Sequence, residues 1–273
     1  MLRRLAALLL LSAALTAAVP GRAGASPAMD AAPAAEPPWS PDVAAARAYA
    51  RARAGVVSFA IRTPRRTYGF RAERHARSAS VVKAMLLVAY LRQASVRDRA
   101  LAAGERALLG PMIRVSDNDA ASRVFGVVGT PGLLRVARAA RMRSFVSGGG
   151  SWGSSLVTAA DQARFCGRID LRVPPRHRGY AMGLLRSISP AQRWGVARVR
   201  PAGWALYFKG GWGSGSGAVD HQVALLTRGG ARVSLAILTA GNPDMAYGNA
   251  TLRGVAARLL RGLAGTLVGT LGD

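Results

Sequence analysis

The order of the apolar segments along the chain constrains the fold more than any other feature of the sequence. Five short runs are rich in β-branched and aromatic residues and are bounded by turn residues, a pattern that favours strands. Two come near the start and three near the end, at 56–62, 67–71, 204–208, 219–226 and 233–239. Turns at 63–66 and at Gly229-Gly230 join neighbouring runs as antiparallel hairpins.

Helical patterns surround and separate these two groups of strands. One precedes the first pair, at 41–53, and one follows the last strand, at 246–263. A long, mostly helical block, 80–188, lies between the two groups. We therefore predict an α+β fold: an antiparallel sheet of about five strands from both chain ends, flanked by terminal helices, with an inserted all-helical domain.

The first residues have the pattern of a secretory signal. Arg3 and Arg4 precede an apolar run at 5–19, which is too short to span a bilayer, and Ala23-Gly24-Ala25 is a small-x-small cleavage pattern. We predict a signal peptide at 1–25 and hence a secreted, extracytoplasmic protein. The predicted organisation then continues with a disordered Ala/Pro-rich linker at 26–40 and one domain at 41–273, with an α/β part at 41–75 and 196–273 and a helical part at 76–195.

The formal net charge of +25 favours anionic partners. The arginines are scattered rather than clustered, and no aromatic residues alternate with them. A solvated basic surface explains this better than specific nucleic-acid binding. We expect a monomer without a transmembrane segment, which associates loosely with anionic polymers of the cell envelope.

The cysteine and histidines indicate neither a disulfide nor a metal site. Cys166 is the single cysteine and lies in a helical pattern, where a buried inert thiol is expected. His75, His177 and His221 are far apart in sequence, and His221, although it follows Asp220 on a predicted strand, is not expected to be catalytic. We predict no cofactor and no bound metal.

Lysine is rare in a chain that otherwise uses arginine. Of 38 basic residues only Lys83 and Lys209 are lysine. Lys83 lies three residues after Ser80 at the expected start of an apolar helix, so that the two side chains share one face. A serine hydroxyl needs a base to become a nucleophile, and lysine can lose its proton on burial whereas arginine cannot. The spacing therefore indicates a nucleophile and its base.

Two further motifs carry polar groups that are typical of an active site. Ser116-Asp117-Asn118 opens a predicted helix, where Ser116 and Asp119 alternatively form a capping box. Lys209-Gly210-Gly211 follows a predicted strand, which we expect to end at 208 before a Gly-rich turn. Glycines there allow a substrate backbone to approach, and the Trp212 N–H with the Ser80 N–H would form an oxyanion hole.

Ser-x-x-Lys, Ser-Asp-Asn and Lys-x-Gly, in this order and at these separations, resemble the class A β-lactamase and penicillin-binding protein superfamily over about residues 45–265. The resemblance implies that Ser80 is acylated, that Lys83 is its base partner and that Ser116 relays a proton to the leaving nitrogen. Asn118 would hold Lys83 and a substrate amide, while Lys209 would attract a substrate carboxylate. Gly210, Gly211 and Trp212 would line the substrate-binding site.

The chain departs from that family in two ways. Gly210 stands where the family has Thr or Ser to contact the substrate carboxylate, and the loop glutamate that activates water is missing. Residues 147–157, which correspond to that loop, contain no carboxylate, and Asp161 after them is expected to form a capping box with Thr158. We therefore predict a serine hydrolase or acyltransferase that deacylates slowly. A β-lactamase with another deacylating base and a non-catalytic envelope-binding protein are the alternatives.

Overall fold

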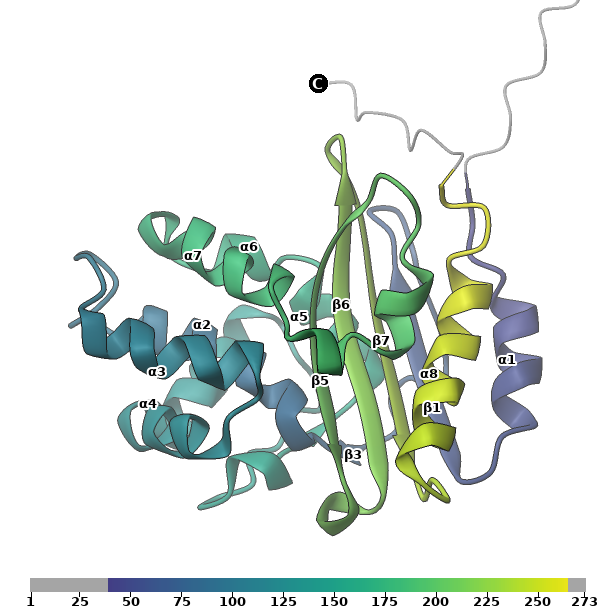
Figure 1. Ribbon diagram of the computed structural model, residues 1–273, viewed down its shortest axis with the longest axis horizontal. Helices are drawn as coiled ribbons and strands as arrows, with labels where there is room; N and C mark the ends of the chain where they lie inside the picture. Colours follow the sequence, from purple (N-terminus) through teal and green to yellow (C-terminus); the bar gives the residue numbers. More distant parts are fainter. Residues whose placement is uncertain (1–38, 265–273) are drawn as a thin grey trace, which may run out of the picture. The chain divides into compact units, whose positions relative to one another are not determined.

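The computed structural model describes residues 39–264, whose central element is a five-stranded antiparallel sheet (Figure 1). The strand order is β2-β1-β7-β6-β5. The bounds are β1 Val56–Arg62, β2 Thr67–Phe70, β5 Ala205–Gly213, β6 Val219–Arg228 and β7 Ala231–Ala240. The register places Phe59 of β1 opposite Ile237 of β7, so the N-terminal and C-terminal strands are direct neighbours. The predicted α+β fold, with one sheet built from both chain ends, is confirmed.

Two helices cover one face of the sheet. These are α1, Val43–Arg51, and α8, Met245–Leu259, which pack on each other and lie on the right of the sheet in Figure 1. Both begin at an aspartate whose side chain accepts a backbone N–H bond, Asp42 and Asp244. Such an N-cap satisfies a donor that the first turn of a helix leaves without a partner.

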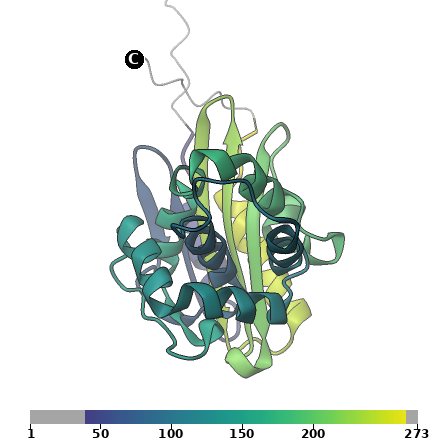
Figure 2. The ribbon, with the colours of Figure 1, turned by 90° about the vertical axis from the view of Figure 1, so that its left-hand side faces the viewer.

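The inserted helices lie against the opposite face, where Figure 2 shows them in front of the strands. They are α2 Lys83–Leu91, α3 Ala103–Arg114, α4 Asn118–Ala139, α5 Ala159–Cys166, α6 Ile169–Arg172 and α7 Pro175–Arg186. Gly129, with φ 56° and ψ −175°, breaks α4 just before Pro131, which separates the two helical patterns of the sequence. The insertion also contains a two-stranded sheet of β3, Ala76–Arg77, and β4, Leu156–Val157.

Short 3-10 turns connect these elements and carry much of the candidate site. They are η1 Ala79–Val82, η2 Trp152–Ser154, η3 Pro190–Gln192, η4 Gly195–Val199 and η5 Ser214–Ser216. η1 precedes α2 directly and packs against β5, while η4 packs against α8. Within residues 39–264, no helix is both long enough and apolar enough to cross a membrane.

The core is continuous from the sheet into the helices. β1 buries Val57, Phe59 and Ile61, and α2 buries every one of its nine residues. Cys166 at the end of α5 is buried as expected, and burial raises the pKa of its thiol to about 12. A thiol in this state is inert as a nucleophile.

Candidate active site

Lys83 is the first residue of α2, and its side chain is fully buried. The helix packs against α3, α4 and α7, and none of its positions faces solvent. Because the helix is buried along its whole length, the lysine at its first position is buried as well. The helix begins three residues later than the expected Ser80, because residues 79–82 form the 3-10 turn η1.

The Ser116-Asp117-Asn118 segment forms the turn between α3 and α4. Ser116 has a left-handed φ of 62°, and Asp117 is the N-cap of α4, because its Oδ1 accepts the Ala120 N–H at 2.7 Å. The alternative in which Ser116 and Asp119 form a capping box is therefore wrong. Since Asp117 caps the helix, the side chains of Ser116 and Asn118 are available to the buried amine of Lys83.

Lys209 lies within β5, which continues to Gly213. The expected strand end at 208 is wrong: Gly210 and Gly211 stay in register opposite Gln222 and His221 of β6. The antiparallel ladder is made by backbone groups, so glycines can continue it at the edge of the sheet. Side chains alternate along a strand, so Lys209 and Gly211 face one side while Gly210 and Trp212 face the other.

The two lysines and Ser116 form one hydrogen-bonded cluster. Lys83 Nζ lies 2.5 Å from the Ser116 carbonyl oxygen, 2.7 Å from Asn118 Oδ1 and 3.2 Å from Ser116 Oγ. Lys209 Nζ lies 2.9 Å from the same Ser116 Oγ and 2.8 Å from the Gly210 carbonyl oxygen. One hydroxyl thus bridges the amines of Lys83 and Lys209, which are separated by 126 positions in the chain.

Burial favours the neutral form of both amines. It lowers the pKa of Lys83 to about 8, against a smaller upward effect of the Asp117 carboxylate. It also lowers the pKa of Lys209 well below the usual lysine value, and the charge of Lys83 lowers it further. A neutral amine has two N–H donors and one lone pair. For Lys83 the Ser116 carbonyl and Asn118 Oδ1 use both donors, which leaves the lone pair to accept a proton.

Ser80 lies in η1 beside this cluster and is partly exposed. Ala79 before it has a left-handed φ of 43°, an uncommon conformation for a residue with a side chain. Within the described part of the chain, the Ser80 hydroxyl donates to no protein acceptor and accepts from no protein donor. Catalytic hydrogen bonds are often completed only when substrate is bound.

Gly211 lets β5 pass close to Ser80. A Cβ at position 211 would lie 2.8 Å from the backbone nitrogens of both Ser80 and Val81, which is closer than real Cβ atoms come. The absence of a side chain at Gly211 therefore lets the edge strand lie next to the Ser80 N–H, whereas the sequence pattern suggested that the glycines make room for a substrate backbone. This is the position at which an oxyanion hole requires a donor.

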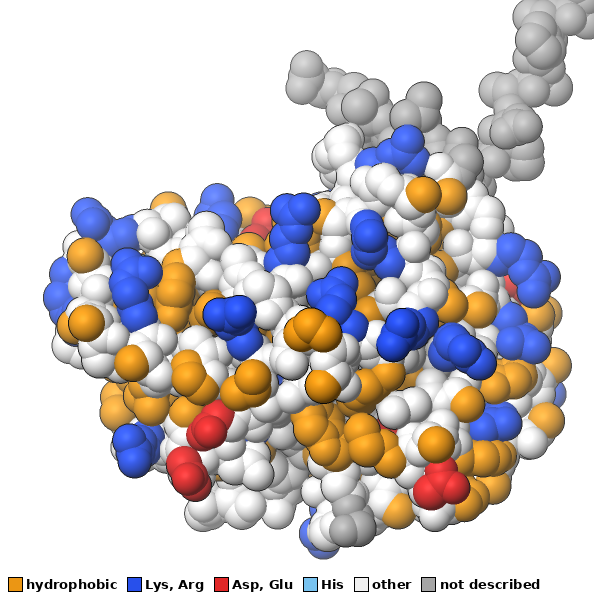
Figure 3. Space-filling model, in the orientation of Figure 1, with side chains coloured by type: hydrophobic (Ala, Val, Ile, Leu, Met, Phe, Trp, Pro, Cys, Tyr) orange, Lys and Arg blue, Asp and Glu red, His pale blue; other side chains and the backbone are white. Residues whose placement is uncertain are grey.

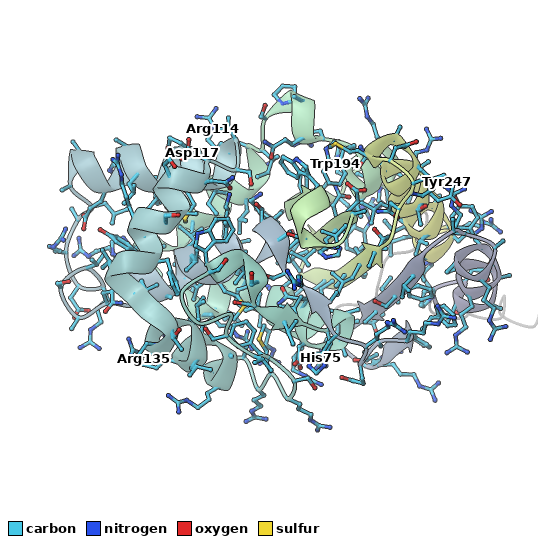
Figure 4. The ribbon with its side chains drawn as sticks, turned by 90° about the horizontal axis from the view of Figure 1, so that it is seen from below. His75, Arg114, Asp117, Arg135, Trp194 and Tyr247 are labelled. Atoms are coloured by element: carbon cyan, nitrogen blue, oxygen red, sulfur yellow. The ribbon has the colours of Figure 1, made fainter. Side chains whose placement is uncertain are left out.

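Trp194 occupies the space beside Gly210. A Cβ at position 210 would meet two ring carbons of Trp194 at 3.1 and 3.2 Å, so a Thr or Ser there would crowd the indole. The Trp194 ring also packs edge-on against Trp212, with 5.9 Å between centroids. Figure 4 shows Trp194 toward the strands and Asp117 among the inserted helices. The lack of a hydroxyl at position 210 and the presence of the Trp194 indole are therefore linked, because the indole occupies the space that a Thr or Ser side chain would need.

The loop at 147–157 lies against Ser80's turn. The Ser78 backbone N–H donates to the Ser155 carbonyl at 2.7 Å, and η1 packs against η2. The Trp152 ring lies 4.7 Å from Lys83 Nζ, and its Nε1 donates to Ser122 Oγ at 3.2 Å. An indole therefore lies beside the Lys83 amine, in a loop that contains no carboxylate.

Asp161 is held in a structural role. Thr158 Oγ1 accepts the Asp161 N–H at 3.2 Å and caps α5 as expected. The Asp161 carboxylate accepts the backbone N–H groups of Arg143 and Ser144 and pairs with Arg164 at 2.7 Å. With its oxygens engaged in this way, the carboxylate is a poor candidate for a water-activating base.

The three histidines bond to separate backbone carbonyls. His75 contacts Ser144 O, His177 contacts Val96 O and His221 contacts Arg77 O. Burial lowers the pKa of His221 to about 4, and its Nδ1 accepts the Thr239 N–H. Across the described residues, no three side chains of His, Cys, Asp or Glu are placed to share a metal ion.

The sequence reasoning missed the two tryptophans of the site, Trp152 and Trp194. Neither belongs to a motif. Trp152 lies in η2, 69 positions from the Lys83 that it contacts, and Trp194 precedes η4 and packs beside Gly210 and Trp212. The one available signal was the Gly at 210, since a missing side chain on a strand implies that another group fills the space.

A family model described as "Beta-lactamase enzyme family" matches residues 105–263, more than half of the chain. Several solved β-lactamases are similar in fold. One from Sphaerobacter thermophilus DSM 20745 superposes with a TM-score of 0.68 at 21% identity, covering 82% of this chain and 97% of its own. One from Xanthomonas campestris pv. campestris str. ATCC 33913 gives a TM-score of 0.66 at 20% identity, with 81% and 97% covered.

A variant of the class A β-lactamase of the last common ancestor of Gram-negative bacteria gives a TM-score of 0.67 at 17% identity, with 82% and 98% covered. A search of curated proteins found no match. The family match spans Ser116 and Lys209 and begins after Ser80 and Lys83, and the bond of Lys83 to Ser116 connects the two parts. The chain belongs to the beta-lactamase enzyme family, within a superfamily of serine hydrolases.

Proposed function

We propose that this protein is an extracytoplasmic serine hydrolase or acyltransferase that forms an acyl-enzyme at Ser80 with amide or β-lactam substrates. The observation that carries this proposal is the convergence of three distant motifs on one hydroxyl: Lys83 and Lys209 both bond to Ser116 Oγ, next to the turn that holds Ser80. Such a cluster of buried amines costs stability, and a general base near neutral pH is a use that justifies it.

The roles follow from the contacts. The Lys83 lone pair takes the Ser80 proton as Oγ forms a bond to the substrate carbonyl carbon. The N–H groups of Ser80 and Trp212 hold the resulting oxyanion. When the intermediate collapses, the C–N bond breaks and the leaving nitrogen takes a proton from Ser116, which Lys83 reprotonates. Lys209, bonded to the same hydroxyl, helps to hold it in place, and its amine would attract a substrate carboxylate.

Asn118 has two tasks in this scheme. Its Oδ1 fixes the Lys83 amine at 2.7 Å, while the residue itself is exposed and can bond a substrate amide. Gly210 and Gly211 leave the edge of β5 open to a substrate backbone, which would add to the sheet as an extra strand.

Release of the acyl group is expected to be slow. An ester at Ser80 needs an activated water, and the loop at 147–157 beside Ser80 has no carboxylate. Asp161 is engaged by two backbone N–H groups and an arginine. Acylation by β-lactams is expected to be slow as well, because Trp194 stands where a hydroxyl would contact their carboxylate.

The location belongs to the same proposal. The pattern at 1–25 is that of a signal peptide and lies outside the described residues, as does most of the proposed linker at 26–40. We further propose that the domain at 41–273, with its helical part at 76–195, acts as a monomer. Its net charge of +25 supports loose electrostatic association with anionic envelope polymers.

The deciding experiment is intact-mass analysis after incubation with a fluorophosphonate, a panel of β-lactams and cell-wall peptides. The expected result is one adduct per chain that persists for minutes or longer, that Ser80→Ala abolishes and that Ser95→Ala, a change at an exposed serine, leaves unaltered. Rapid turnover of a chromogenic cephalosporin without an adduct would instead indicate a β-lactamase with another deacylating base. Absence of any covalent adduct would favour a non-catalytic envelope-binding protein.

A further inference from the structure

A second candidate site lies away from the lysine cluster, at the opposite end of β5. A cavity of about 320 Å³ is lined by Arg186 at the end of α7, by Arg193 and Arg200 at the ends of η3 and η4, and by Gly203 and Trp204 just before β5. It is built by the last residue of α7, by the segment that joins α7 to β5 and by the first two residues of β5, Ala205 and Leu206. Figure 3 shows basic side chains spread across the middle of this face of the molecule.

The guanidinium groups at this cavity have no acidic partner. Among residues 39–264, none of Arg186, Arg193 and Arg200 forms an ion pair with a carboxylate, and no Asp or Glu lines the cavity. A fourth guanidinium is close by, since a Cβ at Gly203 would lie 3.4 Å from Arg228 Nε. The cavity therefore gathers positive charge that the described part of the protein does not neutralise.

Two of the three lining guanidinium groups are held in place. Arg200 Nη1 donates to the Trp204 carbonyl at 2.6 Å. Arg193 Nη1 donates to the Arg186 carbonyl at 3.3 Å, and its guanidinium lies 5.6 Å from the centre of the Phe208 ring. Each guanidinium has five N–H donors, so most donors remain available after these bonds. Fixed donors lose less entropy when a ligand binds than mobile ones.

Trp204 forms a wall of the cavity. Its side chain is only 1% exposed, and its backbone carbonyl accepts from Arg200. Its Nε1–H has almost no accessible surface, so a ligand in the cavity meets the guanidinium groups rather than the indole nitrogen. Those groups are donors, which favours a ligand made of acceptors.

We propose that this cavity binds a phosphoryl group. Three guanidinium groups exceed what one carboxylate can bond, whereas a phosphoryl group carries up to two charges and three or four acceptor oxygens. A free phosphate ester and the headgroup of an anionic phospholipid both present this chemistry. The cavity shares no lining residue with the Ser80 site, so the proposal is independent of the proposed function.

The test measures binding of inorganic phosphate and of glycerol phosphate to the full chain by calorimetry, against chloride at equal ionic strength. The expected result is saturable phosphate binding, weakened at least about tenfold in Arg186→Gln/Arg200→Gln. The matched control is Arg135→Gln/Arg138→Gln, which removes the same charge from the exposed face of α4 and should change the affinity less than about twofold.

Circular dichroism checks that both double variants are folded. Equal losses in the two double variants, or no saturable binding to the wild type, would refute the site. Sedimentation with phosphatidylglycerol vesicles identifies the source: selective loss in Arg186→Gln/Arg200→Gln supports a headgroup ligand, and phosphate binding without vesicle binding supports a soluble one.

Discussion

Lys83 and Lys209 share the Ser116 hydroxyl and are both fully buried, and this explains why neither position carries arginine. An arginine would remain charged and would need several acceptors, whereas a lysine can become neutral on burial. The chain uses lysine at these two positions alone among its 38 basic residues. At the scale of single residues, burial beside one shared hydroxyl therefore favours lysine, whose amine can become neutral, over arginine.

The first prediction tests that amine. Lys83→Arg keeps the charge and approximate size but removes the base, so acylation of Ser80 should fall at least about a hundredfold. The rate of fluorophosphonate labelling measures this, with Arg135→Lys as a matched exchange at an exposed position. Labelling of Lys83→Arg at the wild-type rate would show that the base is another group.

The pH profile is a second consequence of the same residue. Because burial lowers the pKa of Lys83 to about 8, the wild-type acylation rate should rise with pH and level off above about 8. The proton must leave Lys83 before it can take one from Ser80, so the sign is an increase with pH. Stopped-flow labelling from pH 6 to 10 measures it. A profile that is flat through pH 8 would contradict the assignment.

At the scale of elements, β5 and the segment before it determine what the site can bind. β5 is the edge strand next to η1, and Trp194, just before η4, fills the space beside Gly210. The strand therefore offers backbone groups and an indole where a hydroxyl would recognise a carboxylate. This favours substrates with an uncharged group at that place.

The third prediction exchanges these two features. Gly210→Thr alone should acylate no faster with penicillin, because its Cβ would meet the Trp194 ring at 3.1 Å. Gly210→Thr with Trp194→Ala provides both the hydroxyl and the room for it, and acylation should increase about tenfold relative to Trp194→Ala. Adduct formation followed by intact mass gives the rates. An equal acylation rate in Gly210→Thr and in the double variant would show that Trp194 does not limit carboxylate recognition.

At the scale of the whole molecule, two buried groups on β6 oppose each other with pH. Burial, with a smaller contribution from Asp244, raises the pKa of Asp220 to about 6, while burial lowers the pKa of His221 to about 4. Because the pKa of Asp220 is raised, its contribution makes the free energy of unfolding fall as the pH rises from about 4 to 6. Because the pKa of His221 is lowered, its contribution makes the free energy of unfolding rise as the pH rises from about 4 to 6.5. The two effects offset each other in the wild type.

The fourth prediction separates the two groups. Asp220→Asn removes the falling contribution, so the free energy of unfolding of the variant should rise between pH 4 and 6.5, on the order of 2 kcal/mol more than in the wild type. Urea unfolding at several pH values measures the difference. Parallel curves for the two proteins would mean that Asp220 titrates at its ordinary value.

The net charge is also a property of the whole molecule. If it serves loose association with an anionic envelope, binding to acidic polymers should weaken steeply with salt and show no sequence preference on DNA. Filter binding at several salt concentrations measures this fifth prediction. Tight, sequence-selective DNA binding at physiological salt would favour a nucleic-acid partner.

The sequence by itself determined the elements and the chemical groups. Strand and helix periodicities located β1 and β7 and separated the two halves of α4 at Gly129, because these patterns depend on neighbouring residues. The rarity of lysine and its spacing from Ser80 predicted a base, which the labelling experiments test. Side-chain chemistry is a local property, so the sequence is sufficient to reveal it.

Tertiary structure alone decided which groups meet. The sequence did not show that Ser116 Oγ bridges two amines, that Asp117 rather than Ser116 caps α4, or that Trp194 fills the space beside Gly210. The end of β5 was also misplaced, because glycine disfavours strands locally while pairing with β6 overrides that preference. The pKa of Lys83 depends on how completely α2 is covered by its neighbours. Burial and proximity arise from contacts between distant segments, and no local pattern records them.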